Sequence, residues 1–235
     1  MSIWGKISEV VGAIATSAPV AGVLDAVVGL LTGVSDNPER RQVAFTVAMI
    51  ALSAKMAKAD GVVTEDEITA FRDIFDIPPK EQQNVARMFN LAKQDVAGFD
   101  AYAGQILKIY KDDPDILEDI LDGLFHIAEA DGIIHEDELA FLEEVGRIFG
   151  FEDDSFSAIK ARHVKGGEND PYQVLGADHS WSNFELQKLY RNLVKENHPD
   201  RLIARGVPPE FVSMANDKMA AINAAYEQLK KERGL

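Results

Sequence analysis

The sequence predicts an all-α protein, and three observations lead to that prediction. Apolar residues recur every three or four positions along most of the chain, and no window shows sustained alternation of apolar and polar residues. Polar capping residues followed by an early proline or acid mark several helix starts. Glycines and prolines between these segments mark the helix stops and turns. We therefore expect helices joined by short connections.

The composition is that of a globular protein with a substantial core. The chain has 235 residues, of which 46% are apolar and 27% are charged. It contains no cysteine. The absence of cysteine excludes a disulfide framework and a thiolate metal site, and it is compatible with a reducing compartment.

The negative charge is unevenly distributed. The net charge is -15, yet residues 170–235 contain nine basic and nine acidic residues. Residues 1–169 therefore carry the whole excess of negative charge. An acidic body argues against a nucleic-acid partner, because contacts with phosphates need a basic face.

Residues 1–35 form an apolar N-terminal segment. Between residues 10 and 34 the only charged residue is Asp25, and the run is long enough to cross a bilayer. Asp25 lies near its middle, where an acid costs about 2.5–3.5 kcal/mol on insertion. A membrane span or hairpin, helices packed on the domain, a peripheral membrane contact and a mobile tail all stay open. In a span, Arg40 and Arg41 would favour a cytoplasmic body, so we expect a cytoplasmic protein, either free or attached to the inner membrane.

Residues 36–165 are predicted to form an acidic helical domain. Asn37, Pro38 and Glu39 signal a helix start, and residues 43–59 have the apolar composition of a buried helix. A proline pair at 78–79 breaks the chain before a helical pattern over residues 82–91. A further helix start lies at residues 112–115.

One internal repeat stands out within this domain. Residues 58–68 recur as residues 129–139, an offset of 71. In each copy an apolar helix is followed by Gly61 or Gly132, which can adopt the left-handed conformation that ends a helix. Thr64 then fits a helix cap, and His135 takes the equivalent position. The duplicated pattern resembles the TerB-like domain, which implies an all-helical fold over residues 36–165.

The acids of this repeat are weak candidates for a metal site. The spacing D-G-x5-E copies the second half of a calcium-binding loop. The first half fails in both copies, because loop positions one and three carry Met56, Lys58, Ile127 and Glu129. Helix caps and a solvated acidic surface are the favoured interpretation, and we expect no cofactor. The weak metal candidates are Asp60, Glu67, Asp131 and Glu138.

A short glycine-centred linker, residues 166–169, precedes a C-terminal module at residues 170–235, and we expect it to let the two parts reorient. Asp170 and Pro171 open a first helical turn, and Ser182 with Glu185 forms a capping box for a longer helix. That helix has an inward apolar stripe and, on another face, a basic stripe. The basic stripe consists of Lys188, Arg191 and Lys195.

The long helix is predicted to end at residues 197–200. Pro199 disfavours helical geometry at His198, and a loop through Gly206 leads to a last helix. Apolar residues at spacings of three and four in this helix face the preceding one: Ala215, Met219, Ile222, Tyr226 and Leu229. Two antiparallel helices would thus present residues 198–200 at an exposed tip.

Three blocks in this order carry a resemblance to the J domain of the DnaJ family: D-P-Y-x-V-L-G, S-x-x-E-L-x-x-x-Y-R-x-L-V-K-x-x-H-P-D and I-N-x-A-Y-E-x-L. A TerB-like domain followed by a J domain is similar to the DjlA group of bacterial co-chaperones. The resemblance implies a co-chaperone that stimulates the ATPase of a DnaK-type chaperone and helps it hold a client protein. It also implies the contact residues His198, Pro199 and Asp200, with the basic stripe facing an acidic surface of the partner.

Two other functions were weighed against the co-chaperone. The sequence contains no nucleophile motif and no nucleotide-binding glycine loop, so we do not expect an enzyme. His126 is predicted to be a packed or partly buried histidine on an apolar helix face, and His163 and His179 lie in polar segments without partners at metal-ligand spacing. The alternative is an acidic, metal-responsive scaffold in which the C-terminal helices mediate assembly.

Overall fold

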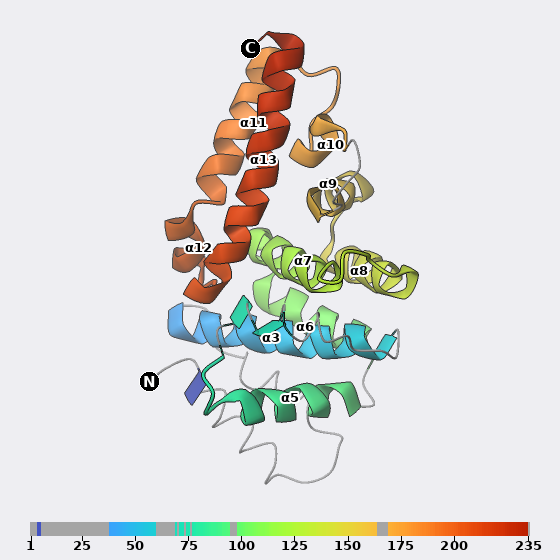
Figure 1. Cartoon of the computed structure of the whole chain (residues 1–235), viewed down its shortest axis with the longest axis vertical. Coiled ribbons are helices and arrows are strands. Elements are labelled where there is room, and N and C mark those ends of the chain that lie inside the picture. Colours follow the sequence, from blue (N-terminus) through green and yellow to red (C-terminus); the bar gives the residue numbers. More distant parts are fainter. Residues whose placement is uncertain are drawn as a thin grey trace.

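The computed structural model describes residues 4–5, 38–59, 69, 71–72, 74–75, 77–94, 98–163 and 169–234. All secondary structure in these ranges is helical, which confirms the all-α prediction. No helix in them is long and apolar enough to cross a membrane. The apolar segment 10–34, residues 60–68 of the first repeat copy and linker residues 166–168 lie outside the described residues. Figure 1 shows stacked helices in the lower part of the molecule and a long upright pair above them.

The helix α3, Pro38–Ala59, forms the centre of the lower body. It begins at the proline that the sequence singled out, and its side chains from Val43 to Ala57 are buried. Helices α5, α6 and α7 all pack against it. A helix that is apolar on every side fits only where neighbours surround it, so this segment occupies the middle of the core.

Within the described residues, the lower body contains further helices besides α3. They are α5 (Gln82–Gln94), α6 (Phe99–Tyr110), α7 (Pro114–Ala128), α8 (Glu136–Phe149) and α9 (Asp153–His163). The predicted helices at 82–91 and after 112–115 are thereby confirmed. The second repeat copy joins α7 to α8, where Gly132 has a φ of 92° and donates its N–H to the Glu129 carbonyl at 2.8 Å. This turn is the helix–glycine–helix connection expected for that copy.

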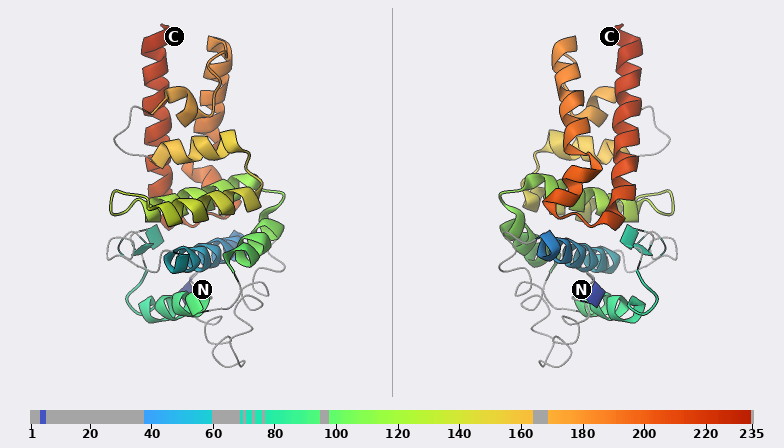
Figure 2. Two further views of the ribbon diagram at one scale, coloured as in Figure 1. Left: turned by 90° about the vertical axis from the view of Figure 1, so that its right-hand side faces the viewer. Right: turned by 90° about the vertical axis from the view of Figure 1, so that its left-hand side faces the viewer.

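The C-terminal module contains the upright pair. Helix α9, Asp153–His163, leads to the short α10, Pro171–Leu175, and then to α11, Asn183–Glu196. The long α13, Val212–Arg233, runs antiparallel to α11, as two side views show (Figure 2). A separate apolar cluster between α10, α11 and α13 contains Leu175, Leu186, Ile222 and Leu229. The module therefore has a small core of its own.

The connection between α11 and α13 differs from the predicted loop. It contains a helix α12, Pro199–Arg205, and a 3₁₀ turn η2, Pro209–Phe211. Proline suits the first turn of a helix, and Gly206 ends this one with a φ of 97°. Pro199 therefore both ends α11, as the sequence predicts, and starts a helix that the sequence pattern did not predict.

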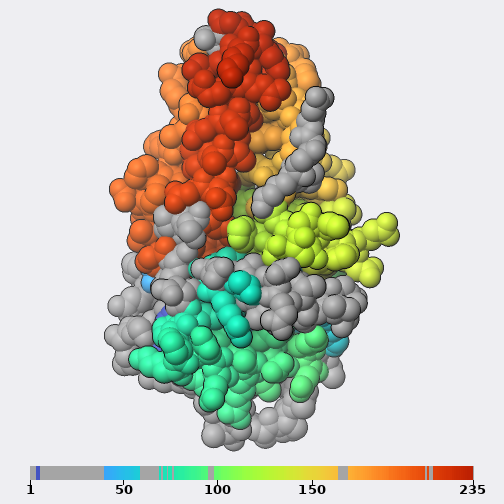
Figure 3. Space-filling model, viewed as in Figure 1, coloured from blue at the N-terminus to red at the C-terminus, as the bar shows by residue number. Residues whose placement is uncertain are grey.

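The module is docked on the lower body. Phe211 packs against Phe45 and Phe75 of the lower body, with ring centroids 4.6 and 5.7 Å apart. Gly123 on α7 leaves room for this ring, because a Cβ there would lie 2.6 Å from the Phe211 Cζ. Figure 3 shows the C-terminal helices, in orange and red, above the green helices of the lower body.

Candidate partner-binding surface

The tip between α11 and α12 presents His198, Pro199 and Asp200. His198 has an extended backbone (φ -67°, ψ 134°), and its Nδ1 accepts a hydrogen bond from the Asp200 N–H at 3.2 Å. The side chain of Asp200 is 89% exposed, and that of His198 is 57% exposed. The tip therefore offers a carboxylate and an imidazole to solvent, as the sequence predicts.

Buried neighbours hold the tip on both sides. Asn197, 5% exposed, donates its side-chain N–H to the Leu193 carbonyl at 2.9 Å. On the other side, Leu202 is 1% exposed and belongs to the core of the lower body. Arg201 also forms an ion pair with Glu196, which bridges the two helices. The three exposed residues are thus displayed on a supported turn.

The basic stripe of α11 faces solvent. Lys188, Arg191 and Lys195 are all exposed, and none forms an ion pair with any residue that the structure describes. Leu186, on the opposite side of the helix, is fully buried. Sequence reasoning missed Phe184, which is 68% exposed and lies four residues before Lys188, on the same face. The spacing of four residues between Phe184 and Lys188 could have predicted this shared face from the sequence.

The pairing of α11 with α13 orients this surface. The rings of Tyr190 and Tyr226 stack with centroids 3.8 Å apart. The Tyr190 hydroxyl also donates to the Asn223 side-chain oxygen at 3.0 Å. These contacts confirm that the predicted apolar stripes of the two helices face each other. One exception is Ala215, which packs with the core of the lower body.

A buried charge cluster joins the module to α7. The Lys218 Nζ lies 2.7 Å from a carboxylate oxygen of Glu118 and 2.7 Å from one of Asp122. Arg205 contacts Asp119, with a nitrogen–oxygen distance of 3.4 Å. Buried charges need partners of opposite charge, so this network stabilises the observed docking of the module on α7.

His163 belongs to the same cluster, although the sequence indicated no polar partner for it. Its Nε2 lies 2.9 Å from the Asp122 Oδ1, and its ring stacks on Phe125. The sequence did contain one sign of a polar cluster, because Glu118 and Asp122 lie one turn apart on α7. It could not show that His163 contacts Asp122, because that contact depends on the tertiary fold.

Burial and charge separate the pKa values of the acids in this cluster. Burial raises the pKa of Asp119 to about 7, although Lys218 and Arg205 oppose this shift. Burial acts in the same direction on Asp122, but Lys218 and His163 outweigh it and hold the pKa of Asp122 below its usual value. The pKa of His163 is raised, because its hydrogen bonds to Asp122 and Glu129 outweigh the effect of burial. Asp119 is thus the acid of this cluster that titrates near neutral pH.

The described metal candidates accept backbone hydrogen bonds, Asp131 in the turn after α7 and Glu138 in the capping box of α8. A carboxylate oxygen of Asp131 accepts the Ile133 N–H at 3.0 Å, and one of Glu138 accepts the His135 N–H at 2.9 Å. No group of three or more metal-ligand side chains occurs within the described ranges. Asp60 and Glu67 lie outside them. The contacts of the second copy fit the capping interpretation of these acids.

Comparison with known proteins agrees with both parts of the chain. Residues 46–161 match the family described as tellurite resistance protein TerB, and residues 170–234 match the DnaJ domain. No solved structure is significantly similar to the chain.

Several relatives share the whole arrangement. A Photobacterium profundum protein named co-chaperone protein DjlA is 30% identical, over 84% of this chain and 81% of its own length. Proteins of the same name from Coxiella burnetii and Legionella pneumophila are 28% and 26% identical, covering 85% and 98% of this chain and 81% and 96% of their own lengths. With a TerB domain, a following DnaJ domain and this coverage, the chain belongs to the DjlA family.

Proposed function

We propose that the chain is a J-domain co-chaperone that stimulates the ATPase of a DnaK-type chaperone through His198, Pro199 and Asp200. The observation that carries the proposal is the exposed, supported tip at the end of the α11–α13 pair of a DnaJ-family domain. The chain itself does no covalent chemistry in this proposal. It biases its partner towards hydrolysis and so towards holding a client.

The chemistry of the surface suits such a partner. An exposed carboxylate at Asp200 can form charge-assisted hydrogen bonds with an arginine of the chaperone. Lys188, Arg191 and Lys195 form an exposed cationic face on a chain of net charge -15. Such a face speeds association with an acidic surface, and its effect weakens as salt screens the charges.

In this proposal the TerB-like domain, residues 36–165, acts as an adaptor for the J domain at residues 170–235. Leu202 and Phe211 of the J domain pack into the core of the TerB-like domain. These contacts support the tip and set the orientation of α11. We place the protein in the cytoplasm, with attachment to the inner membrane through residues 10–34. The client protein is set by surfaces outside the tip.

The test is single-turnover ATP hydrolysis by a cognate DnaK-type chaperone with the full chain added. We expect acceleration that is lost in Asp200→Asn and kept in Asp137→Asn, a matched change at an exposed acid of α8, which lies on the other side of the molecule from α12 (Figure 1). Replacing the three stripe cations by glutamine should slow association at low salt and flatten its salt dependence. Equal hydrolysis rates with and without the folded chain would sink the proposal and favour the scaffold alternative.

A further inference from the structure

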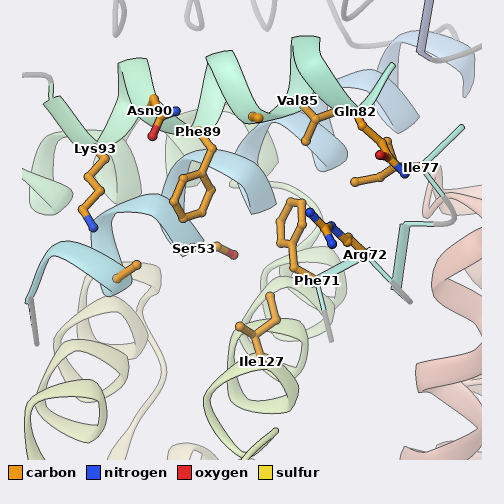
Figure 4. A pocket seen from close by; sticks show the side chains of 12 residues that line it. Ser53, Phe71, Arg72, Ile77, Gln82, Val85, Phe89, Asn90, Lys93 and Ile127 are labelled. Atoms are coloured by element: carbon orange, nitrogen blue, oxygen red, sulfur yellow. The ribbon is translucent and has the colours of Figure 1, made fainter. Parts of the chain in front are cut away.

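A cavity of about 330 Å³ lies in the lower body, away from the proposed partner surface. Helices α3 and α5 form its two sides, and Phe71, Arg72 and Ile77 precede α5 (Figure 4). Ile127 of α7 also lines it. Its volume lies within the range of small-molecule sites, which is about 300–1,000 Å³.

The cavity is long and mainly apolar. Helix α5 lines the cavity with one of its faces, which runs from Gln82 to Lys93 with lining residues at alternating spacings of three and one. At about 1.5 Å per residue, that face is roughly 16 Å long. The apolar lining residues are Ala57, Phe71, Ile77, Val85, Ala86, Phe89 and Ile127. A narrow apolar space of this length suits an extended alkyl chain.

Ser53 places an unsatisfied hydroxyl in this apolar lining. The residue is 3% exposed, and its Oγ has no hydrogen-bond partner among the described residues. Figure 4 shows its side chain between the rings of Phe71 and Phe89. The hydroxyl of Thr46, on the same helix, instead donates to the Gln42 carbonyl at 2.9 Å. A buried polar group without a partner is costly, so the Ser53 hydroxyl points to a ligand atom that completes it.

Two cations line the same cavity. Figure 4 shows Lys93 and Arg72 on opposite sides of Ser53, and neither forms an ion pair with a described residue. Both stand out on a chain with a net charge of -15. Cations beside an apolar space attract a ligand that has an anionic group and an apolar body.

We propose that this cavity binds an amphiphile with one alkyl chain and an anionic headgroup, such as a medium-chain carboxylate. The alkyl chain lies between α3 and α5, where it replaces water against the apolar walls. The headgroup pairs with Arg72 or Lys93, and the Ser53 hydroxyl hydrogen-bonds to an oxygen of the ligand. The site is independent of ATPase stimulation by the J domain.

Isothermal titration calorimetry of the full chain with dodecanoate, below its micelle concentration, tests the proposal. Dodecyltrimethylammonium is the control ligand, because it has the same alkyl chain and the opposite charge. Vesicles of phosphatidylglycerol form a third arm, which distinguishes a free amphiphile from a lipid surface. We expect dodecanoate to bind at least tenfold more tightly than the cation.

Four variants locate the binding. Ala86→Trp, at an exposed lining position, should fill the cavity and abolish binding. Ser53→Ala should weaken binding about threefold to tenfold without lowering the melting temperature, because this hydroxyl has no partner to lose among the described residues. Arg72→Gln or Lys93→Gln should weaken binding at least threefold. Arg87→Gln, on α5 but outside the cavity, is the matched control and should leave it unchanged.

Several outcomes would overturn the proposal. One is the absence of dodecanoate binding to a folded sample, and another is equal affinity for the two detergents. Unchanged affinity in Ala86→Trp, with its fold checked by circular dichroism, would place the ligand elsewhere. Binding to the vesicles alone would assign the interaction to a lipid surface and not to this cavity.

Discussion

Lys218 shows how single residues connect the two parts of the molecule. It lies on α13, is 7% exposed, and has Glu118 and Asp122 of α7 within 2.7 Å. Burial lowers the pKa of a lysine, but these carboxylates outweigh that effect and raise the pKa of Lys218. The amine therefore stays charged, and removing any one partner would leave a buried charge uncompensated, which typically costs about 3–5 kcal/mol.

Asp119 makes the contact sensitive to pH. Its pKa is about 7 in the folded protein, raised from the ordinary value of 3.8. Because the pKa of Asp119 is higher in the folded protein than in the unfolded chain, protonation of this carboxyl favours the folded state. This stabilising contribution is lost as the pH rises from about 4 to 7. The pKa of His163 is also raised, so its contribution is lost as pH rises above 6.5.

We therefore expect Asp119→Asn to remove part of this pH dependence. Between pH 5 and 7 the unfolding free energy of the wild type should fall by up to about 1.4 kcal/mol per pH unit through this group. The variant should show a shallower fall in urea denaturation at pH 5, 6 and 7. Asp112→Asn serves as the control and should follow the wild type, whereas an equally steep fall in Asp119→Asn would contradict the assignment.

Among the elements, α12 has the largest effect on the arrangement. It begins at Pro199, ends at Gly206, and buries Leu202 against the lower body. The same short helix thus supports the tip and anchors the module. Gly206 can end α12 with a φ of 97°, and without a side chain it can lie close to Arg41 of α3.

Gly206→Ala should destabilise the protein much more than Gly234→Ala. Both glycines have positive φ, but a Cβ at Gly206 would lie 2.4 Å from the Arg41 Cβ, and one at Gly234 meets nothing within 4 Å. The left-handed conformation and the overpacking together should cost about 2–4 kcal/mol at Gly206. Guanidinium denaturation of both variants measures the difference, and similar losses at the two positions would contradict the close contact.

At the scale of the whole molecule, part of the C-terminal module packs into the core of the lower body. Val207, Phe211 and Met214 of the C-terminal region belong to the apolar cluster of the lower body. Unfolding either part would expose this shared surface, which couples their stabilities. The J-like helices are thus held in a defined orientation by the domain that precedes them.

We expect the full chain to unfold in one transition. Trp4 is buried in the lower body, where its ring centroid lies 6.5 Å from that of Phe75, so its fluorescence reports on this part. Trp181 reports on the C-terminal module. Fluorescence-monitored urea unfolding of Trp4→Phe and Trp181→Phe isolates each reporter. Coincident midpoints, corrected for each variant's stability by circular dichroism, would support a shared core. A separate, earlier transition at Trp181 would show that the modules unfold independently.

Local patterns made most of the helices and the tip predictable. Prolines and capping residues marked the starts of α3, α7, α10 and α11, because these residues act on the adjacent backbone. Exposure of the basic stripe followed from helical spacing alone. Helix α12 was missed, because the same proline both ends one helix and begins the next.

The sequence by itself determined the all-α class, the repeat, and the residues that share each face of α11 and α13. These features depend on helical periodicity and caps, which act over a few residues. Only the tertiary structure decided that Lys218, Arg205 and His163 meet the acids of α7, and that Ser53 lies in a cavity with two cations. Such contacts join residues from distant parts of the chain, so they follow from how the helices pack and not from local spacing.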